Sequence, residues 1–305
     1  MEGARTMSLI VLAASSLHLQ GQAPEPAGGG VRPGVLPRAW QVSGPDCTGT
    51  PAFQIHEYNP DLIILRESGC SNYEKPFLYL LFGREKVLLL DTGAGKTDVV
   101  RVVQEQIDQW SRRNGRERTP LVVAHTHGHG DHISGDADFK ALQNTTVVDA
   151  TPAAVQAFFG LGHWPGAATT FDLGGRILDI IPIPGHEPSS IAVYDRQTGI
   201  LFTGDTLYPG RLYVRDAAAF RQSIQRLVDF THNKVVAHIL GNHIEEARTP
   251  YVDYPVGTVH QPDEHALELG RAHLLELNDA LRDPGGRLRR VAFRDFTIWP
   301  VESVK

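Results

Sequence analysis

The sequence predicts an α/β domain in which mixed β-sheets are covered by helices. From residue 52 to residue 305, short apolar runs of strand length alternate with segments whose apolar residues recur at helical spacing. Two of the runs, Phe77–Phe82 and Val87–Leu90, are separated only by a short turn that begins at Gly83. Antiparallel strand pairs are therefore expected beside helical crossovers, which argues against a purely parallel sheet.

Strands are expected wherever a short apolar run is bounded by turn-forming residues. The runs of this kind are Leu62–Arg66, Phe77–Phe82, Val87–Leu90, Leu121–Ala124, Ile177–Ile183, Ile191–Tyr194, Ile200–Thr203, Val235–Ile239 and Arg290–Ile298.

Helices are expected where apolar side chains return every three or four residues. One helix is predicted around Val99, Val103, Ile107 and Trp110, and another around Phe220, Ile224, Leu227 and Val228. A further helix carries Leu267, Leu274, Leu277 and Leu281, and we expect it to begin near Pro262-Asp263 and to end at Pro284-Gly285.

Residues 1–23 are predicted to be an export signal. Arg5 precedes an apolar stretch from Met7 to Leu17, which is too short to span a bilayer, and small residues follow as far as Ala23. We therefore expect a secreted or periplasmic protein with no further membrane contact, or a cytoplasmic one if the segment is not a signal.

The segment 24–51 is rich in proline and glycine and is predicted to be an irregular lead-in to the catalytic domain at 52–305. Cys47 lies in this lead-in and Cys70 lies in the domain. In an exported protein the two could form a disulfide, but two unrelated thiols fit the sequence equally well, because it sets no distance between them.

Composition narrows the range of functions. The chain is 41% hydrophobic and 21% charged, as soluble enzymes are, and disordered, collagen-like and membrane-spanning classes are excluded. The net charge of −6 supplies no basic surface for a polyphosphate, so no nucleic-acid partner is expected. The 14 histidines outnumber the 2 cysteines, which favours imidazole chemistry over thiolate chemistry.

The most informative segment is the histidine-rich run that follows the strand-like residues Leu121–Ala124. His127 and His129 are two residues apart, so an extended backbone turns both imidazoles to the same side, where they can bind one metal ion. Asp131 and His132 come after Gly130, which permits a turn toward a second point nearby. The alternative, an exposed histidine-rich loop, does not account for the residues that follow later in the chain.

From about residue 52 onward, the chain resembles the metallo-β-lactamase superfamily. The resemblance rests on several motifs in the same order, namely Leu88-Leu89-Leu90-Asp91-Thr92-Gly93, His127-Gly128-His129-Gly130-Asp131-His132, Pro184-Gly185-His186, Phe202-Thr203-Gly204-Asp205-Thr206 and Gly241-Asn242-His243. It implies an αββα sandwich of two mixed β-sheets flanked by helices, with a dinuclear metal site at one edge of the sheets. It also assigns His127, His129 and His186 to one metal, Asp131, His132 and His243 to the other, and Asp205 to both.

Other residues near these motifs are expected to support the metal ligands or to pack in the core. His238 falls within an apolar run and is interpreted as a core or supporting imidazole, whereas His243 lies beside a glycine turn. His125 is expected to hold the orientation of a ligand. Asp91 is expected to order the loop after its strand through hydrogen bonds.

Imidazole and carboxylate ligands suit zinc, with iron or manganese as alternatives. Two zinc ions about 3.5–4 Å apart can share a bridging hydroxide. We expect this hydroxide to attack the acyl carbon of a small-molecule ester, lactone or thioester, and Asp131 to carry a proton to the leaving atom. By the same resemblance, class B β-lactamases usually hold Cys or Ser at the position of Asp205. Antibiotic hydrolysis is therefore a less favoured function for this chain.

Tyr208 is a second catalytic candidate. It takes the place where, by the same resemblance, acyl-homoserine lactonases carry a tyrosine that contacts the substrate carbonyl, and a phenol there could donate to a developing oxyanion. The alternative is an aromatic side chain packed in the loop. Because Gly204-Asp205-Thr206-Leu207 is also similar to glyoxalase II, the motifs do not separate lactones from thioesters.

Other functions on the same fold rank lower. The superfamily includes iron-containing oxidoreductases such as sulfur dioxygenases, but the complete second ligand set disfavours a mononuclear site. A phosphodiesterase of the ribonuclease Z kind is disfavoured by the acidic charge balance. A non-catalytic binding protein would have no need of all the ligand candidates. The sequence names neither a single substrate nor an oligomeric state.

Overall fold

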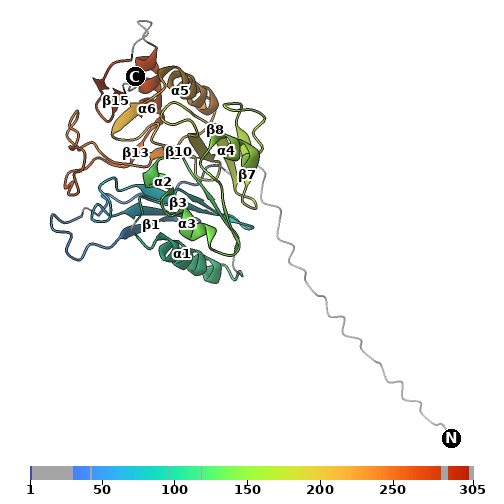
Figure 1. The fold of residues 1–305 in the computed structure, drawn as a ribbon. Helices are drawn as coiled ribbons and strands as arrows, with labels where there is room; N and C mark the ends of the chain where they lie inside the picture. Colours follow the sequence, from blue (N-terminus) through green and yellow to red (C-terminus); the bar gives the residue numbers. More distant parts are fainter. Residues whose placement is uncertain (2–29, 42, 96, 118, 283–287, 302–305) are drawn as a thin grey trace. The chain divides into compact units, whose positions relative to one another are not determined.

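A computed structural model describes residues 1, 30–41, 43–95, 97–117, 119–282 and 288–301, and residues 2–23 of the predicted export signal lie outside this set. The chain divides into a unit Met1–Gly30 and a unit Val31–Lys305. All described helices and strands belong to the second unit (Figure 1). Within the described residues, no helix is both long enough and apolar enough to cross a membrane.

One sheet of the second unit has the strand order β1-β2-β3-β4-β5-β6. Its strands are β1 (Phe53–Asn59), β2 (Leu62–Glu67), β3 (Phe77–Phe82), β4 (Val87–Leu90), β5 (Leu121–Ala124) and β6 (Thr145–Val147). The first four strands pair antiparallel, whereas β5 runs parallel to both β4 and β6. The expected mixture of antiparallel pairs and crossovers is therefore confirmed.

A second sheet has the order β13-β12-β10-β9-β8-β7. Its strands are β7 (Thr169–Asp172), β8 (Ile177–Pro182), β9 (Ile191–Asp195), β10 (Ile200–Gly204), β12 (His238–Gly241) and β13 (Glu268–Leu269). A smaller sheet joins β11 (Arg211–Val214), β15 (Thr297–Pro300) and β14 (Val291–Ala292).

The helices of the described residues are α1 (Val99–Arg113), α2 (Gly130–Ile133), α3 (Asp136–Lys140), α4 (Pro152–Phe159), α5 (Ala217–Thr231) and α6 (Arg271–Leu281).

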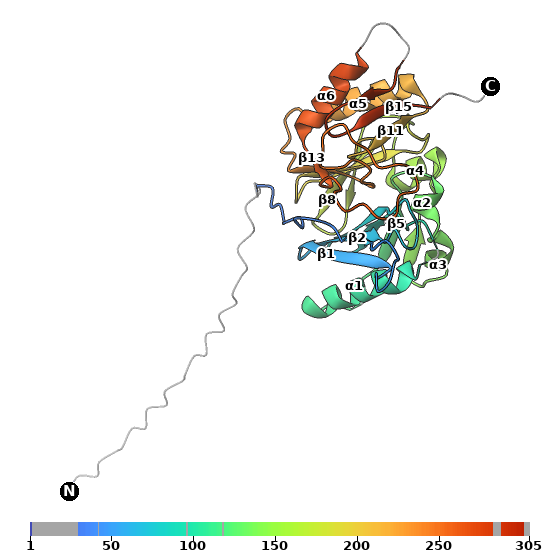
Figure 2. The same cartoon turned by 90° about the vertical axis from the view of Figure 1, so that its left-hand side faces the viewer.

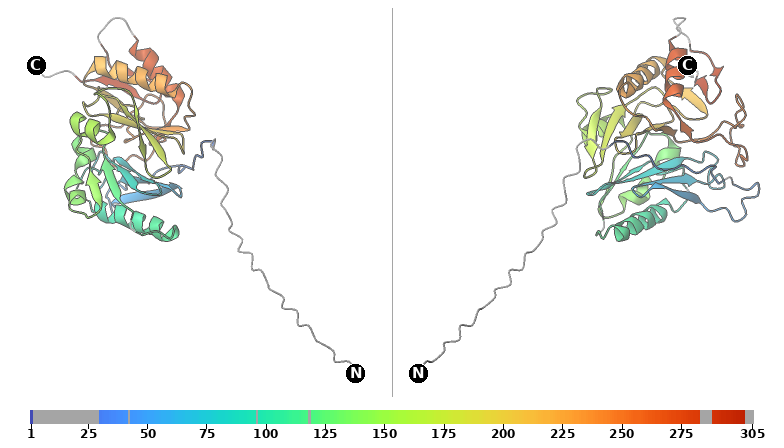
Figure 3. Two further views of the ribbon diagram at one scale, coloured as in Figure 1. Left: turned by 90° about the vertical axis from the view of Figure 1, so that its right-hand side faces the viewer. Right: turned by 180° about the vertical axis from the view of Figure 1, so that it is seen from behind.

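Three layers of buried side chains make the unit an αββα sandwich. The two large sheets face each other across a core that includes Leu88, Leu90 and Phe202, and the alternate residue Leu89 faces outward to helix α1. Helices α5 and α6 cover the outer face of the second sheet through another core that includes Leu201. Figures 2 and 3 show α1 beyond one sheet and α5 with α6 beyond the other, so the predicted fold class is confirmed.

Several element boundaries differ from the expectation. The last helix begins at Arg271 and not near Pro262, because Leu269 is already paired with Ile239 in the β12–β13 ladder. Strand β12 begins at His238, three residues later than expected. The run Arg290–Ile298 covers β14 and the first half of β15, which pair antiparallel. Strands β1, β6, β7, β11 and β13 and helices α2 to α4 were not predicted from the sequence.

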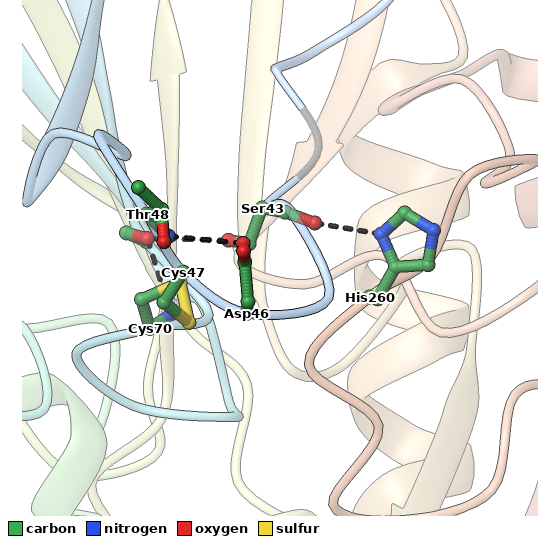
Figure 4. The surroundings of a disulfide bond; sticks show 7 residues. Ser43, Asp46, Cys47, Thr48, Cys70 and His260 are labelled. Atoms are coloured by element: carbon green, nitrogen blue, oxygen red, sulfur yellow. Dashed lines mark hydrogen bonds between the residues drawn. A yellow bond between two sulfur atoms is a disulfide. The ribbon is translucent and has the colours of Figure 1, made fainter.

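The described part of the lead-in is bound to the domain. Its described residues contain no helix or strand, yet Trp40 is buried in the core between the two sheets. Cys47 forms a disulfide with Cys70 in the β2–β3 loop, and the carbonyl of Ser43 accepts a hydrogen bond from His260 at 2.7 Å (Figure 4). Closing a loop with a sequence separation of 23 residues stabilises the folded state by about 3 kcal/mol.

Candidate metal centre

The seven residues that the resemblance assigns to metals lie at one edge of the two large sheets. His127, His129, Asp131 and His132 follow strand β5 of the first sheet, the last two on the short helix α2. The others follow strands of the second sheet, His186 after β8, Asp205 after β10 and His243 after β12. Strand ends of both sheets therefore supply the centre, as the resemblance implies.

The first group of candidate ligands consists of three imidazoles and a carboxylate. The Nδ1 atom of His129 lies 2.9 Å from Nε2 of His127 and 3.0 Å from Nε2 of His186. Oδ2 of Asp205 lies 3.7 Å from Nε2 of His127 and 3.6 Å from Nε2 of His186. Ligand atoms of a tetrahedral zinc ion are about 3.4 Å apart, so these separations fit one zinc site.

The second group consists of two imidazoles and two carboxylates. Oδ2 of Asp131 lies 3.2 Å from Nε2 of both His132 and His243. Asp205 also reaches this group, since its Oδ1 lies 3.3 Å from Nε2 of His243 and its Oδ2 lies 3.6 Å from Nε2 of His132. Both groups satisfy the geometry of a candidate metal site and share Asp205.

Asp205 provides an independent sign that a cation belongs here. Its Oδ1 atom is buried and lies 3.3 Å from Nε2 of His243, and it has no hydrogen-bond donor among the described residues when that imidazole is in the neutral form that binds a metal. A buried carboxylate oxygen without a donor is costly, and a cation between Asp205 and the surrounding imidazoles would compensate it. The residues therefore fit a bound metal.

Protonation preferences differ between the two groups. Burial lowers the pKa of His186 to about 4 and also lowers that of His127, so these imidazoles are neutral, which is the form that binds metals. Burial acts in the same direction on His243, but the carboxylates of Asp205 and Asp131 raise its pKa well above the usual value. This excess of negative charge at the second group favours a divalent cation there.

Backbone carbonyls set the orientation of one imidazole in each group. Nδ1 of His186 donates to the carbonyl of Tyr213 at 2.8 Å, and Nδ1 of His243 donates to the carbonyl of Glu74 at 2.8 Å. Each bond fixes the ring tautomer and leaves Nε2 free for a metal. Glu74 lies in the β2–β3 loop, four residues after the disulfide-bonded Cys70.

The side chain of Asp91 makes no hydrogen bond to a described residue of the loop after its own strand, contrary to the expectation, but it bonds to the segments after β5 and β12 and holds a candidate ligand. Its carboxylate accepts hydrogen bonds from the backbone nitrogen and hydroxyl of Thr126, both at 2.8 Å, and from the side chain of Asn242 at 2.6 Å. Nδ1 of His132 lies 3.1 Å from the same carboxylate. Asp91 thus connects the candidate ligand His132 to strand exits of both large sheets.

The other two histidines considered from the sequence lie outside this arrangement. His125 contacts the carbonyl of Val148 at 3.0 Å and Asp136 at 2.8 Å, so it orients no candidate ligand, contrary to the expectation. It joins the end of β5 to helix α3 instead. His238 is partly buried at the start of β12, where its ring lies 6.1 Å from that of Tyr58.

Tyr208 is buried beside the centre, with its ring 5.7 Å from that of His243. Its hydroxyl donates to the carbonyl of Arg211 at 2.5 Å and lies 3.1 Å from Glu245. Contact with a substrate therefore remains a prediction, and it would require the hydroxyl to leave the Arg211 carbonyl.

Glu74 and Tyr213 were not identified from the sequence. Their backbone carbonyls act on the imidazoles, and a carbonyl is common to every residue, so no residue type marks this role. The alternation of buried Leu212 and Val214 with polar neighbours could have located strand β11. It could not have shown which imidazole the strand meets.

Comparison with known proteins agrees with this geometry. Residues 76–258, more than half of the chain, match the family model described as metallo-beta-lactamase superfamily. The chain belongs to the metallo-beta-lactamase superfamily. The matched region includes every candidate ligand of this superfamily member, and the lead-in and the C-terminal segment with α6 lie outside it.

Among curated relatives, a hydroxyacylglutathione hydrolase from Rhizobium meliloti (strain 1021) is 31% identical over 147 residues, covering 47% of this chain and 56% of the relative. An acyl-coenzyme A thioesterase from Homo sapiens is 25% identical over 205 residues, covering 54% of this chain and 72% of the relative. The chain thus spans little more than half the length of the first of these proteins.

Among solved structures, a metallo-beta-lactamase from Pontibacter korlensis superposes with a TM-score of 0.51 at 19% sequence identity. The match covers 76% of this chain and 99% of the other. This likeness supports the αββα fold.

Proposed function

We propose that this superfamily member is a dinuclear zinc-dependent hydrolase that cleaves an acyl compound, with a thioester as the leading substrate class and esters or lactones as alternatives. The observation that carries the proposal is Asp205, which is within reach of both ligand groups and whose buried Oδ1 faces only the candidate ligand His243, at 3.3 Å. The names of the relatives, a hydroxyacylglutathione hydrolase and an acyl-coenzyme A thioesterase, favour the thioester.

In this proposal His127, His129 and His186 hold one zinc ion, Asp131, His132 and His243 hold the other, and Asp205 holds both. Two zinc ions, when bound, would supply a Lewis acid and a water of lowered pKa. The chain's own contribution is to fix the ligand positions and to move protons. Burial of the imidazoles keeps bulk water from competing for the ligand atoms.

Asp131 is the proposed proton carrier. Its side chain is 20% exposed, whereas that of Asp205 is 9% exposed, so Asp131 is the carboxylate of the centre that a substrate can approach more readily. One of its oxygens is held by His132 and His243, which fixes the carboxylate in place. A fixed carboxylate can take up the proton that the attacking water releases and then pass it to the leaving atom.

A screen of the purified protein with metal analysis of the same sample tests the function. We expect two zinc ions per chain and faster hydrolysis of acyl thioesters than of lactones, β-lactams or phosphodiesters. Chelation should abolish the activity and zinc should restore it. One iron ion per chain with oxygen consumption would support the oxidoreductase instead, and preferential cleavage of phosphodiesters would support a phosphodiesterase.

We also propose that the protein is exported and that the mature chain begins after about residue 23. The Cys47–Cys70 disulfide supports this proposal, because such bonds persist mainly in oxidising compartments. N-terminal sequencing and thiol titration of the native protein provide the test. We expect a new N-terminus and no free thiol, whereas intact Met1 on a cytoplasmic protein with two free thiols would contradict export.

A further inference from the structure

The β2–β3 loop, residues 68–76, holds the candidate ligand His243 through one backbone carbonyl. The carbonyl of Glu74 accepts a hydrogen bond from Nδ1 of His243 at 2.8 Å. This bond selects the tautomer whose Nε2 faces Asp131 at 3.2 Å and Asp205 at 3.3 Å. The geometry of the second ligand group therefore depends on where this loop places the Glu74 carbonyl.

The direction of the Glu74 carbonyl is not one that the loop maintains by itself. The peptide bond of this carbonyl leads into Lys75, whose φ is +50°, in the left-handed region that costs free energy for any residue except glycine. Hydrogen bonds inside the loop run from the backbone nitrogen of Asn72 to the carbonyl of Ser68 and from that of Lys75 to the carbonyl of Asn72. These bonds close local turns, so the position of the loop must be set by contacts with other segments.

Contacts with distant segments hold the loop on both sides of Glu74. After this residue, the buried ammonium group of Lys75 donates to the carbonyl of Thr258 at 2.8 Å. Before it, Cys70 is bonded to Cys47 of the lead-in. The disulfide is the covalent contact, and its two cysteines are partly exposed, so a reductant can reach it.

A disulfide positions a loop only if its other end is fixed, and the lead-in is fixed. Trp40 is buried in the core between the two large sheets. The carbonyl of Ser43 accepts a hydrogen bond from His260 at 2.7 Å, and its hydroxyl lies 3.2 Å from the hydroxyl of Ser68 at the start of the loop (Figure 4 shows the contact with His260). Cys47 follows these anchors and precedes strand β1, so the disulfide ties the loop to a segment that is packed on the domain.

The family model does not account for this connection. It matches residues 76–258, which include His243, whereas Cys47, Cys70 and Glu74 lie outside the match. The lead-in and the β2–β3 loop thus add a contact to a ligand of the shared fold.

We propose that the Cys47–Cys70 disulfide positions His243, so that the metal ion of the second ligand group is bound tightly only while the two cysteines are joined. The inference rests on the proposed dinuclear zinc centre and adds a redox dependence that is confined to one of the two ions. When a dithiol reduces the bond, each cysteine sulfur gains one electron and one proton, and the dithiol becomes a disulfide. The loop then loses its covalent anchor, and the Glu74 carbonyl is held less firmly against the imidazole.

The test compares the oxidised, zinc-loaded full chain with the same chain after reduction and with the double variant Cys47→Ser/Cys70→Ser. Reduction uses a phosphine, which takes oxygen from water to become a phosphine oxide, and the reagent is removed before measurement. Titration with a competing chelator gives the affinity for each zinc ion, and melting temperatures are recorded in parallel. Val103→Ala, in the core between the first sheet and helix α1, is the control for a general loss of stability.

We expect the reduced chain and the double variant to bind the second zinc ion about tenfold more weakly than the oxidised chain, the size typical for loss of a contact that orients a ligand. The affinity for the first ion should stay within about threefold, because the carbonyl that holds His186 comes from strand β11 and not from this loop. Reoxidation should restore the affinity of the wild-type chain, and the phosphine should not affect the double variant. Val103→Ala should lower the melting temperature and leave both affinities unchanged.

The same titration separates this inference from the proposed function. Two zinc ions bound with unchanged affinity in the double variant and in the reduced chain would overturn the inference and leave the dinuclear centre intact. Equal weakening of both ions, or the same weakening in Val103→Ala, would also overturn it, because the disulfide would then act only through overall stability. Fewer than two zinc ions on the oxidised wild-type chain would overturn the dinuclear centre and the inference together. If the double variant does not fold, the chain reduced after folding gives the same comparison.

Discussion

Replacing Asp205 with Asn is expected to remove metal from both ligand groups and to abolish most of the activity. Asparagine keeps the shape of the side chain but loses the negative charge and one of the two oxygens that face the imidazoles. If the metals stabilise the transition state by roughly 4 kcal/mol, the loss of this stabilisation lowers kcat/KM about a thousandfold. Elemental analysis should give well under one zinc ion per chain, and a steady-state assay should give the fall in rate.

Asp131→Asn is the matched control for Asp205→Asn. Asp131 belongs only to the second ligand group, so this variant should keep about one zinc ion at the first group. Full metal and full activity in Asp205→Asn would show that this carboxylate does not bridge. Loss of both ions in Asp131→Asn would show that the two groups are not separable.

Replacing Gly185 with Ala is expected to cause the largest loss of stability among substitutions near the centre. Gly185 has a φ of +139°, and a Cβ atom there would lie 2.5 Å from Cα and 2.6 Å from N of Phe220 at the start of helix α5. Backbone atoms cannot move aside as a side chain can, so we expect a cost of roughly 3 kcal/mol or more. Thermal denaturation should show a fall in Tm of roughly 6–10 °C.

Gly185→Ala should also weaken metal binding at the first group, because His186 follows directly and the Gly185 carbonyl accepts from Arg215 and Asp216 at 3.0 and 2.9 Å. Gly160→Ala is the control, since Gly160 has a φ of +67° but open space around it, and it should cost only about 1 kcal/mol. Equal melting temperatures for the two variants would mean that contact with Phe220 is not what requires glycine at 185.

The buried strands were predictable because each is a continuous apolar run. Strands β3, β4 and β5 have the expected limits, and all of their residues are buried, so hydrophobicity alone marked them. Strand β1 was not identified, because only Phe53 and Tyr58 are buried in it and the residues between them are mostly polar or charged. Strand β13 contains only two residues and exists because it pairs with β12.

The candidate ligands were predictable because local spacing restricts where their side chains can point. His127 and His129 follow a buried strand, the backbone at His129 is extended, and a glycine precedes Asp131 and His132. Family motifs added His186, Asp205 and His243. These residues carry their chemistry in the side chain, so the residue type itself was informative.

Contacts between distant segments were decided by the tertiary structure alone. The sequence left the pairing of Cys47 with Cys70 open, and folding joins these cysteines. It left Tyr208 either as a contact of the substrate or as an aromatic packed in the loop, and the fold buries this side chain and directs its hydroxyl to the Arg211 carbonyl. Residue type and spacing thus determined which side chains can bind metals. The partner of each hydroxyl or ring nitrogen depends instead on which groups folding brings within about 3 Å of it.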